Sequence, residues 1–439
     1  MIRRSTPTYY DPEEEVPKSN PPYLATFLKK KAPNLKALSL YIETDEPFQI
    51  NVDAFEGHTP TISSLYLIRF SWSWSAPLFS PSLTSLILYG PVMWGNKCVK
   101  TLQHLPLLHH LQLTDTDALR REDRGIIVPI HHSPSVKLEH LKTLELKGGR
   151  VDVTKLSLEL DIPLSTTIFL TSPHVFAIPK DDDTCPEFES LFSFASRWIE
   201  RRQRKRIFPR VLHVKSDIPN YAMGLTFHLW GPRVRITSTR GLFRIADTAP
   251  SFQLRLDAHY PAPLLKRRDR CTFYPGWMLR RVIPHLPLTE VHTLYLEQLP
   301  SMVDSRTAFE GLSGVHTLCV YDYQECIFRD LITGLPNDKD SHKGHSEQED
   351  VLFPALNTVI LLNTYARGRV LEFVAERARL NHAVSTLRLV DHSPVSDQWL
   401  EELRQHVANV VWDSNKVEVL KLVDSDDDLS TYSESREEE

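Results

Sequence analysis

The sequence predicts an α/β fold, namely an irregular leucine-rich-repeat-like solenoid with parallel strands on its concave face and helices and loops outside. The first observation is a short pattern that occurs ten times: an apolar residue, two variable ones, an apolar residue, one variable and an apolar residue. The second is the spacing of the copies, and the third is the helical or irregular sequence between them. Alternation of strand-like and helical segments is typical of parallel sheets.

The ten copies share an alternation at their last two apolar positions, which would lie on one face of a strand. They span residues 35–40, 62–67, 83–88, 108–113, 141–146, 291–296, 315–320, 356–361, 384–389 and 417–422. A long gap separates the first five copies from the last five. Of the eight intervals on the two sides of this gap, five fall within the period of roughly 20–29 residues of leucine-rich repeats, and the others require insertions. A doubly wound sheet would show continuous β-branched strands and a glycine-rich phosphate loop, and neither occurs.

Composition divides the chain into three parts. Residues 1–22 carry five prolines and an acidic cluster, which predicts a disordered lead-in, and residues 424–439 form an acidic tail that we also expect to be disordered. Residues 23–423 are expected to form one irregular leucine-rich-repeat domain. Within it, residues 205–275 interrupt the pattern as a β-rich insert, and residues 337–350 lack apolar side chains and predict a mobile loop.

Several local elements follow from periodicity. Helices are expected at residues 23–31, 187–205, 367–380 and 396–409, the last with Ser396 as its N-terminal cap. Strands are expected at residues 225–230, 234–237 and 252–256, and Gly231-Pro232 predicts a hairpin turn between the first two.

The composition is that of a globular protein: 41% hydrophobic and 24% charged residues over 439 positions. The net charge is −5, while residues 424–439 alone carry −7, so nothing indicates nucleic-acid binding. Five scattered cysteines without a Cys-x-x-Cys pair predict a reducing, intracellular location, either cytoplasmic or nuclear. No signal peptide or long apolar run is found, so we expect no membrane association.

No catalytic or metal-binding motif was found, so we expect neither an enzyme nor a cofactor. Catalytic triads depend on geometry rather than spacing, which leaves an enzyme on an α/β sheet as a minor alternative. Adjacent histidines such as His109-His110 and His131-His132 point to opposite faces of a strand, so each pair offers one metal ligand at most. We therefore expect no metal site there or at residues 181–183.

The residues between the apolar positions would face a partner. Tyrosine suits such a surface, because it combines a large contact area with a polar tip, although tyrosine also favours strands in general. The candidate partner-binding residues are Tyr41, Tyr66, Tyr89, Gln112, Glu145, Tyr295, Tyr321 and Arg388.

A basic run occupies residues 201–206. It is consistent with a patch for an acidic partner or a nuclear-import signal. It is equally consistent with the solvated end of a helix, where cations complement the helix dipole, and we favour this second interpretation.

The order of these segments resembles the leucine-rich-repeat portion of F-box-type proteins from mushroom-forming fungi. The resemblance rests on the repeated copies, on the segment 160–170 (LDIPLSTTIFL), on the helix at 277–280 that leads to Leu286-Pro287-Leu288, and on the closing segment 410–413. It covers residues 20–423 and depends on the order of the pieces.

The resemblance implies a substrate receptor of a cullin-type ubiquitin ligase, in which an F-box holds the ligase adaptor and the repeats bind a protein substrate. The chain departs from the family at two points. Residues 1–22 are too few for an F-box helix bundle, and the asparagine that follows each regular repeat strand is missing, which implies a less curved solenoid. The alternative is a free-standing repeat scaffold without a ubiquitin-ligase role.

Overall fold

The structure is a computed structural model. It describes residues 22–42, 48–50, 53–90, 96–115, 136–148, 150–175, 186–217, 222–231, 235–239, 242–245, 250–259, 278–299, 305–321, 328, 331, 351–362, 367–390, 396–413 and 419–421. The predicted lead-in (except residue 22), loop and tail, together with residues 131–132 and 181–183, lie outside these ranges.

One mostly parallel sheet of 14 strands dominates the fold. In spatial order its strands are β1 (Ala37–Tyr41), β3 (Ser64–Ile68), β5 (Ser85–Gly90), β6 (His110–Asp115), β8 (Thr143–Lys147), β10 (Thr167–Val175), β15 (Phe252–His259), β12 (Ala222–Trp230), β11 (Val211–Asp217), β16 (Thr293–Glu297), β17 (Thr317–Tyr321), β18 (Thr358–Leu362), β19 (Thr386–Val390) and β20 (Asn409–Asp413). The predicted α/β class with parallel strands is confirmed.

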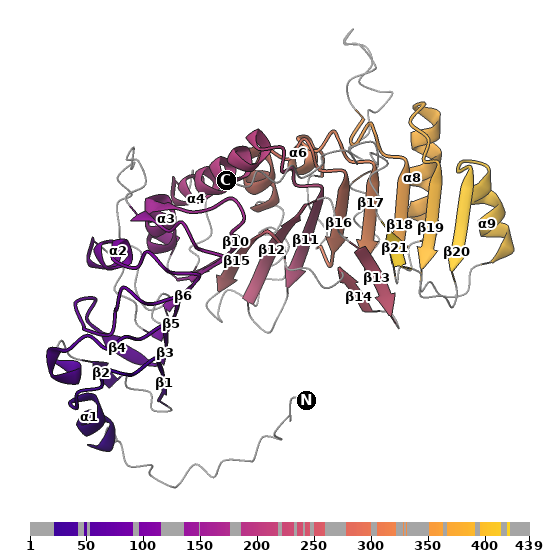
Figure 1. The fold of residues 1–439 in the computed structure, drawn as a ribbon. Coiled ribbons are helices and arrows are strands. Elements are labelled where there is room, and N and C mark those ends of the chain that lie inside the picture. The colour runs from indigo at the N-terminus through magenta and orange to yellow at the C-terminus, as the bar shows by residue number, and fades with distance from the viewer. Residues whose placement is uncertain are drawn as a thin grey trace, which may run out of the picture.

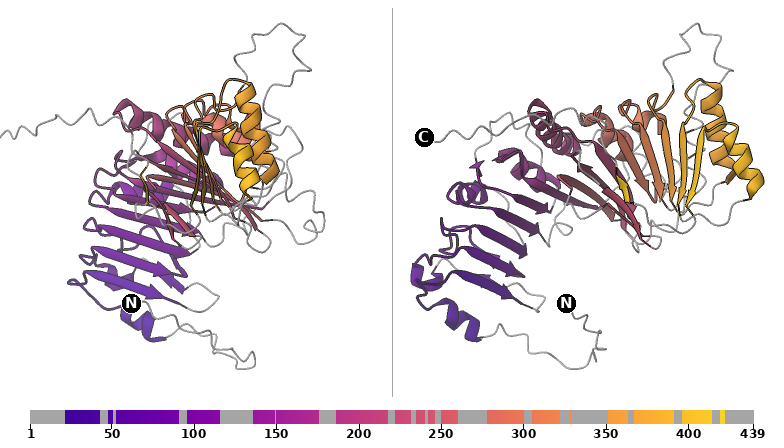
Figure 2. Two further views of the ribbon diagram at one scale, coloured as in Figure 1. Left: turned by 90° about the vertical axis from the view of Figure 1, so that its right-hand side faces the viewer. Right: turned by 45° about the vertical axis from the view of Figure 1, so that its right-hand side comes forward.

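Small sheets and helices surround the main sheet. The small sheets are β2 (Phe48–Ile50) with β4 (Phe70–Trp72), β7 (Val136–Lys137) with β9 (Leu160–Asp161), and β14 (Leu242–Ile245) with β13 (Arg235–Thr239) and β21 (Val419–Lys421). The helices are α1 (Pro22–Leu28), η1 (Ala54–Gly57), α2 (Asn96–Gln103), α3 (Arg150–Glu159), α4 (Pro186–Arg204), η3 (Ile283–His285), α6 (Ser305–Phe309), α8 (Arg367–Arg379) and α9 (Asp397–Arg404). Figure 1 shows the strands along the inner side of a bent molecule and the helices along its outer side, and Figure 2 shows the same arrangement from two other directions.

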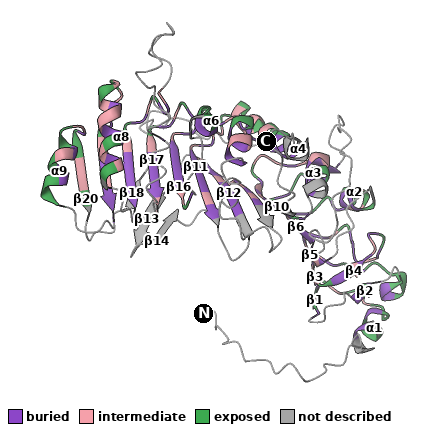
Figure 3. Ribbon diagram, turned by 180° about the vertical axis from the view of Figure 1, so that it is seen from behind, coloured by how far each residue is buried: buried purple, intermediate pink, exposed green. Residues whose placement is uncertain are grey.

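The apolar pattern places leucine on leucine across the sheet. Leu65 pairs with Leu86, Leu86 with Leu111 and Leu111 with Leu144, and each of these side chains is fully buried. The other half of the sheet repeats this arrangement from β16 to β19. These side chains form the core beneath the helices, and Figure 3 shows the middle of the sheet as buried and the outward surfaces of α8 and α9 as largely exposed.

A repeated main-chain contact sets this register. The carbonyl oxygen of Thr84 accepts hydrogen bonds from the N–H groups of both His109 (2.8 Å) and His110 (3.0 Å), and the carbonyl of His109 does the same for Lys142 and Thr143. From β16 onward, His292, His316 and Asn357 provide the equivalent carbonyls. Because these residues directly precede their strands, each strand starts at the same height as its neighbour.

One inverted strand lies in the middle of the sheet. All pairings in the main sheet are parallel except those of β12, which is antiparallel to both β11 and β15. Two reversals restore the original direction, so that β15 is parallel to β10 and β11 is parallel to β16. The β-rich segment 205–275 thus contributes three central strands to the main sheet.

Nine of the ten apolar copies form strands of the main sheet, while the tenth does not. Residues 419–421 pair with β13 in a separate sheet, and the main sheet ends at β20 instead. The hairpin predicted at Gly231-Pro232 is also wrong, because β12 pairs on both sides with β11 and β15.

The helices expected near 23–31, 187–205 and 367–380 are confirmed. So is the Ser396 cap, whose hydroxyl accepts a hydrogen bond from the N–H of Trp399.

No helix among the described residues has the length and apolar character needed to cross a bilayer.

A buried arginine holds the turn ahead of β18. Arg377 lies on the inward side of α8 and is 0% exposed. Its guanidinium donates to the carbonyl oxygens of Leu352 (2.8 Å), Phe353 (3.0 Å) and His382 (3.1 Å). Phe353 has a φ of 54°, which is unfavourable for a side chain with a Cβ atom. Burial lowers the pKa of Arg377 to about 10, so the side chain is still charged at neutral pH.

We expect Arg377→Met to lower the free energy of unfolding by about 3 to 5 kcal/mol, because it leaves three carbonyl oxygens without their charged donor. Urea denaturation of the full chain measures the change. Arg369→Gln is the matched control, since Arg369 pairs with Glu372 on the exposed side of the same helix and should change stability by no more than about 0.5 kcal/mol. Equal stabilities of the two variants would contradict the role given to Arg377.

Candidate binding face

Alternate residues of the main sheet point away from the helix-covered core, and we call this surface the inner face. Strand register arranges it in two rows. The first row holds Ser39, Tyr66, Ile87, Gln112, Glu145, Phe169, Gln253, His228, His213, Tyr295, Cys319, Ile360 and Arg388. The second row holds Tyr41, Ile68, Tyr89, Thr114, Lys147, Thr171, Arg255, Thr226, Lys215, Glu297, Tyr321, Leu362 and Val390.

The first three strands expose an aromatic strip on the inner face. Tyr41 is 58% exposed, and the half-buried rings of Tyr66 and Tyr89 meet edge to face with their centroids 6.3 Å apart. The amide nitrogen of Gln112 donates to the hydroxyl of Tyr89. Burial and the nearby Glu145 raise the pKa of Tyr89, so this phenol is neutral and can act as a donor. Rings held in this way lose little conformational freedom when a partner binds.

Five side chains of the inner face are buried over β16 to β19. Tyr295, Cys319, Ile360, Leu362 and Val390 are each at most 7% exposed and form a second apolar cluster, separate from the main core. Burial raises the pKa of Tyr295 above its ordinary value and that of the Cys319 thiol to about 12. These groups stay neutral and contribute packing rather than an accessible surface.

All eight candidate partner-binding residues lie on the inner face, but the structure brings only five of them together. Tyr41, Tyr66, Tyr89, Gln112 and Glu145 lie on five consecutive strands. The other three, which are Tyr295, Tyr321 and Arg388, lie beyond four intervening strands, so about 24 Å separates β8 from β16. Tyr295 is 2% exposed and offers little surface to a partner, whereas Tyr321 and Arg388 are half-buried.

A polar network that the sequence did not indicate joins the inverted strand to its neighbours. The carboxylate of Glu297 accepts hydrogen bonds from His213 Nε2 (3.0 Å) and from Lys215 Nζ (2.9 Å). The Nδ1 atoms of His213 and His228 lie 3.2 Å apart, and the centroid of the Tyr295 ring lies 4.4 Å from that of His213. The sequence signal for β11 is the alternation of apolar and polar residues in Leu212-His213-Val214-Lys215, whereas the strands expected within residues 205–275 begin only at residue 225.

The short distance between His213 and His228 limits how many of these two imidazoles can be protonated. Because two Nδ1–H groups cannot face one another at this distance, at most one of the two imidazoles is charged. Burial and the neighbouring His213 lower the pKa of His228 to about 3. Burial alone would raise the pKa of Glu297, but the hydrogen bonds from His213 and Lys215 outweigh it and leave the pKa below its ordinary value. Both oxygens of the Glu297 carboxylate already accept hydrogen bonds, which makes Glu297 a poor general base. The network therefore stabilises the position of β12 beside its neighbours.

No group of three or more acidic, histidine or cysteine side chains within the described ranges has the arrangement of a metal site. The basic run 201–206 forms the last turn of α4 and the residues after it. Arg201 there pairs with Asp161 (3.1 Å) and Arg204 with Glu200 (3.7 Å).

Comparison with family models, with curated proteins and with solved structures finds no match for this chain.

We expect the His228 site to make stability depend on pH. His228 is neutral in the folded chain down to a pKa of about 3, while an unfolded histidine takes up a proton near pH 6.5. Its contribution is thus fully present above pH 6.5 and is lost as the pH falls from 6.5 towards 3. Between pH 7 and pH 4 the wild-type chain should lose about 1 to 3 kcal/mol more unfolding free energy than His228→Gln. His104→Gln, which changes an exposed histidine after α2, should follow the wild type; identical profiles for all three proteins would refute the assignment.

Proposed function

We propose that this chain is a protein-interaction module that binds a protein partner on the inner face of β1, β3, β5, β6 and β8. The observation that carries the proposal is the strip of Tyr41, Tyr66 and Tyr89 on three adjacent strands, with Gln112 and Glu145 continuing it. Aromatic side chains beside a few fixed polar groups are typical of the energetically dominant part of protein interfaces. Tyr41 contributes accessible area, while the contact of Tyr89 with Gln112 presents ordered polar atoms.

We further propose that the fold is an irregular leucine-rich-repeat-like solenoid. Support comes from the in-register leucines, from the repeated carbonyl contact before each strand, and from the outer placement of the helices (Figure 1). In this view the inverted strand β12 and its neighbours are an insertion that the repeat accommodates by two reversals of direction.

The finer proposal is that the module is the substrate-recognition part of an F-box-like ubiquitin-ligase receptor. The sequence resemblance supports it, with the repeats binding the substrate and an F-box, wherever it is supplied, binding the ligase adaptor. The alternative is a free-standing scaffold that binds its partner on the same face without a ligase. The two hypotheses make different predictions about which proteins accompany the chain.

Tyr41→Ala should reduce recovery of the bound partner by about tenfold or more, as expected for loss of an aromatic hot spot. The measurement is affinity purification of the tagged full chain from its source organism, followed by quantitative mass spectrometry. Phe27→Ala is the matched control, because Phe27 is 44% exposed but lies on α1, outside the inner face. Equal losses in the two variants, or no loss in either, would contradict binding at the inner face.

The same experiment separates the receptor from the scaffold. For a receptor, a ligase adaptor and a cullin should co-purify in near-stoichiometric amounts, and Tyr41→Ala should leave them unchanged while the substrate is lost. For a scaffold, the partner is recovered without either ligase component.

A further inference from the structure

A hollow opens on the helix side of the main sheet, whereas the aromatic strip lies on the inner face. It lies between α3, β9 and α4 and has a volume of about 330 Å³. Its apolar floor includes Leu160, Ile162, Phe194 and Trp198, each at most 5% exposed. This volume is within the range of small-molecule sites, which are mostly apolar with a few placed polar groups.

Two guanidinium groups border this hollow. Arg197 and Arg201 are exposed residues on the side of α4 that also presents Phe194 and Trp198 to the floor. Arg201 forms an ion pair with Asp161, another lining residue (3.1 Å). Arg197 donates its Nε–H to the carbonyl of Ser193 (3.4 Å) and has no carboxylate partner among the described residues. Among the described residues, the border therefore carries one positive charge, that of Arg197, without an ion-pair partner.

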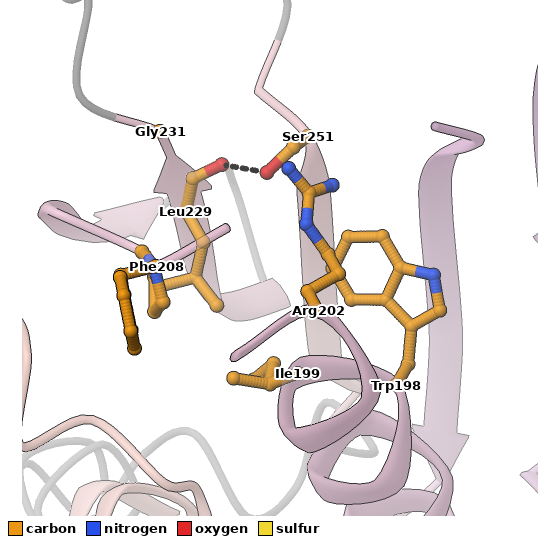
Figure 4. Close-up of a pocket in the computed structure, with 8 residues that line it drawn as sticks. Trp198, Ile199, Arg202, Phe208, Leu229, Gly231 and Ser251 are labelled. Carbon is orange, nitrogen blue, oxygen red and sulfur yellow. Dashed lines mark hydrogen bonds between the residues drawn. The ribbon is translucent and has the colours of Figure 1, made fainter. Parts of the chain in front are cut away.

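A neighbouring hollow beside α4 is too small for such a ligand. Figure 4 shows Trp198, Ile199, Arg202, Phe208 and Leu229 around this hollow. Its volume is about 10 Å³, which is about the volume that one water molecule needs. The guanidinium of Arg202 lies 4.6 Å from the centroid of the Trp198 ring and occupies this side of α4. Burial lowers the pKa of Arg202, because its guanidinium packs against the Trp198 ring and is partly shielded from water.

We propose that the larger hollow binds a monocarboxylate with an apolar body, such as an aryl-alkyl or medium-chain acid. The carboxylate would accept paired hydrogen bonds from Arg197 and from the remaining N–H groups of Arg201, while the apolar body covers the floor at Leu160 and Ile162. Charge complementarity selects this class of ligand, because a neutral apolar molecule leaves Arg197 unpaired and a cation is repelled. The site is independent of the partner-binding function proposed for the inner face.

The probe is 4-phenylbutyrate, and 4-phenylbutan-1-ol is its neutral counterpart. Isothermal titration of the full chain should give saturable binding of the acid with a Kd near or below about 1 mM, and binding of the alcohol about five- to tenfold weaker. Arg197→Gln should weaken binding of the acid by about five- to tenfold and leave the alcohol unchanged. Asp161→Asn should tighten binding of the acid by about two- to threefold, because it removes the anion that competes for Arg201.

Arg204→Gln is the matched control, since Arg204 lies in the last turn of the same helix and pairs with Glu200 outside the hollow. It should bind the acid as the wild type does. Leu158→Trp, which places a larger side chain at the edge of the hollow, should abolish binding of both probes. Absence of saturable binding, equal effects of Arg197→Gln and Arg204→Gln, or unchanged binding by Leu158→Trp would each overturn the proposal. Failure here would leave the recovery of partners by Tyr41 variants unaffected.

Discussion

The architecture depends on one main-chain contact that recurs along the sheet. A carbonyl oxygen just ahead of one strand accepts two N–H groups from the start of the next, as between Thr84 and His109-His110. Because each contact fixes a strand against its neighbour, a one-residue slip would turn every leucine of that strand out of the core. The leucine stacks and the two rows of the inner face both follow from this register.

The two faces of the sheet then have separate roles. Leucines supply burial on the covered face, so the residues between them are free to vary on the other face. In the first half of the sheet, the residues on this other face include Tyr41 and its aromatic neighbours. In the second half, they form an apolar cluster that is closed to solvent. Between the halves, the inverted strand β12 adds no exposed charge of its own, since His228 stays neutral beside the paired Glu297. The partner surface that we propose lies in the first half of the sheet for this reason.

The spacing of apolar residues predicted most strands of the main sheet correctly, and the predictions that failed have physical reasons. The spacing of apolar residues determines which face a side chain occupies, and Tyr66, Tyr89 and Gln112 lie where it placed them. It does not determine what covers that face, so Tyr295 was assigned to the partner surface although it is buried. Pairing depends on neighbours distant in sequence. Residues 417–422 carry the apolar pattern, yet β21 pairs with β13, while β20 completes the main sheet with Val410 and Trp412 in register with Leu387 and Leu389.

The polar network illustrates the same limit, because His213 and His228 become adjacent only through the antiparallel pairing of β11 with β12. The inverted strand β12 lies within one continuous sheet and is hydrogen-bonded along both edges. Native-state hydrogen exchange of the backbone amides tests it most directly. The amides of residues 225–229 should be protected as strongly as those of β16 and β17, because all three strands lie between two hydrogen-bonded neighbours. Fast exchange of these amides beside slow exchange in β16 and β17 would contradict this arrangement and would show that β12 is a loosely attached insertion.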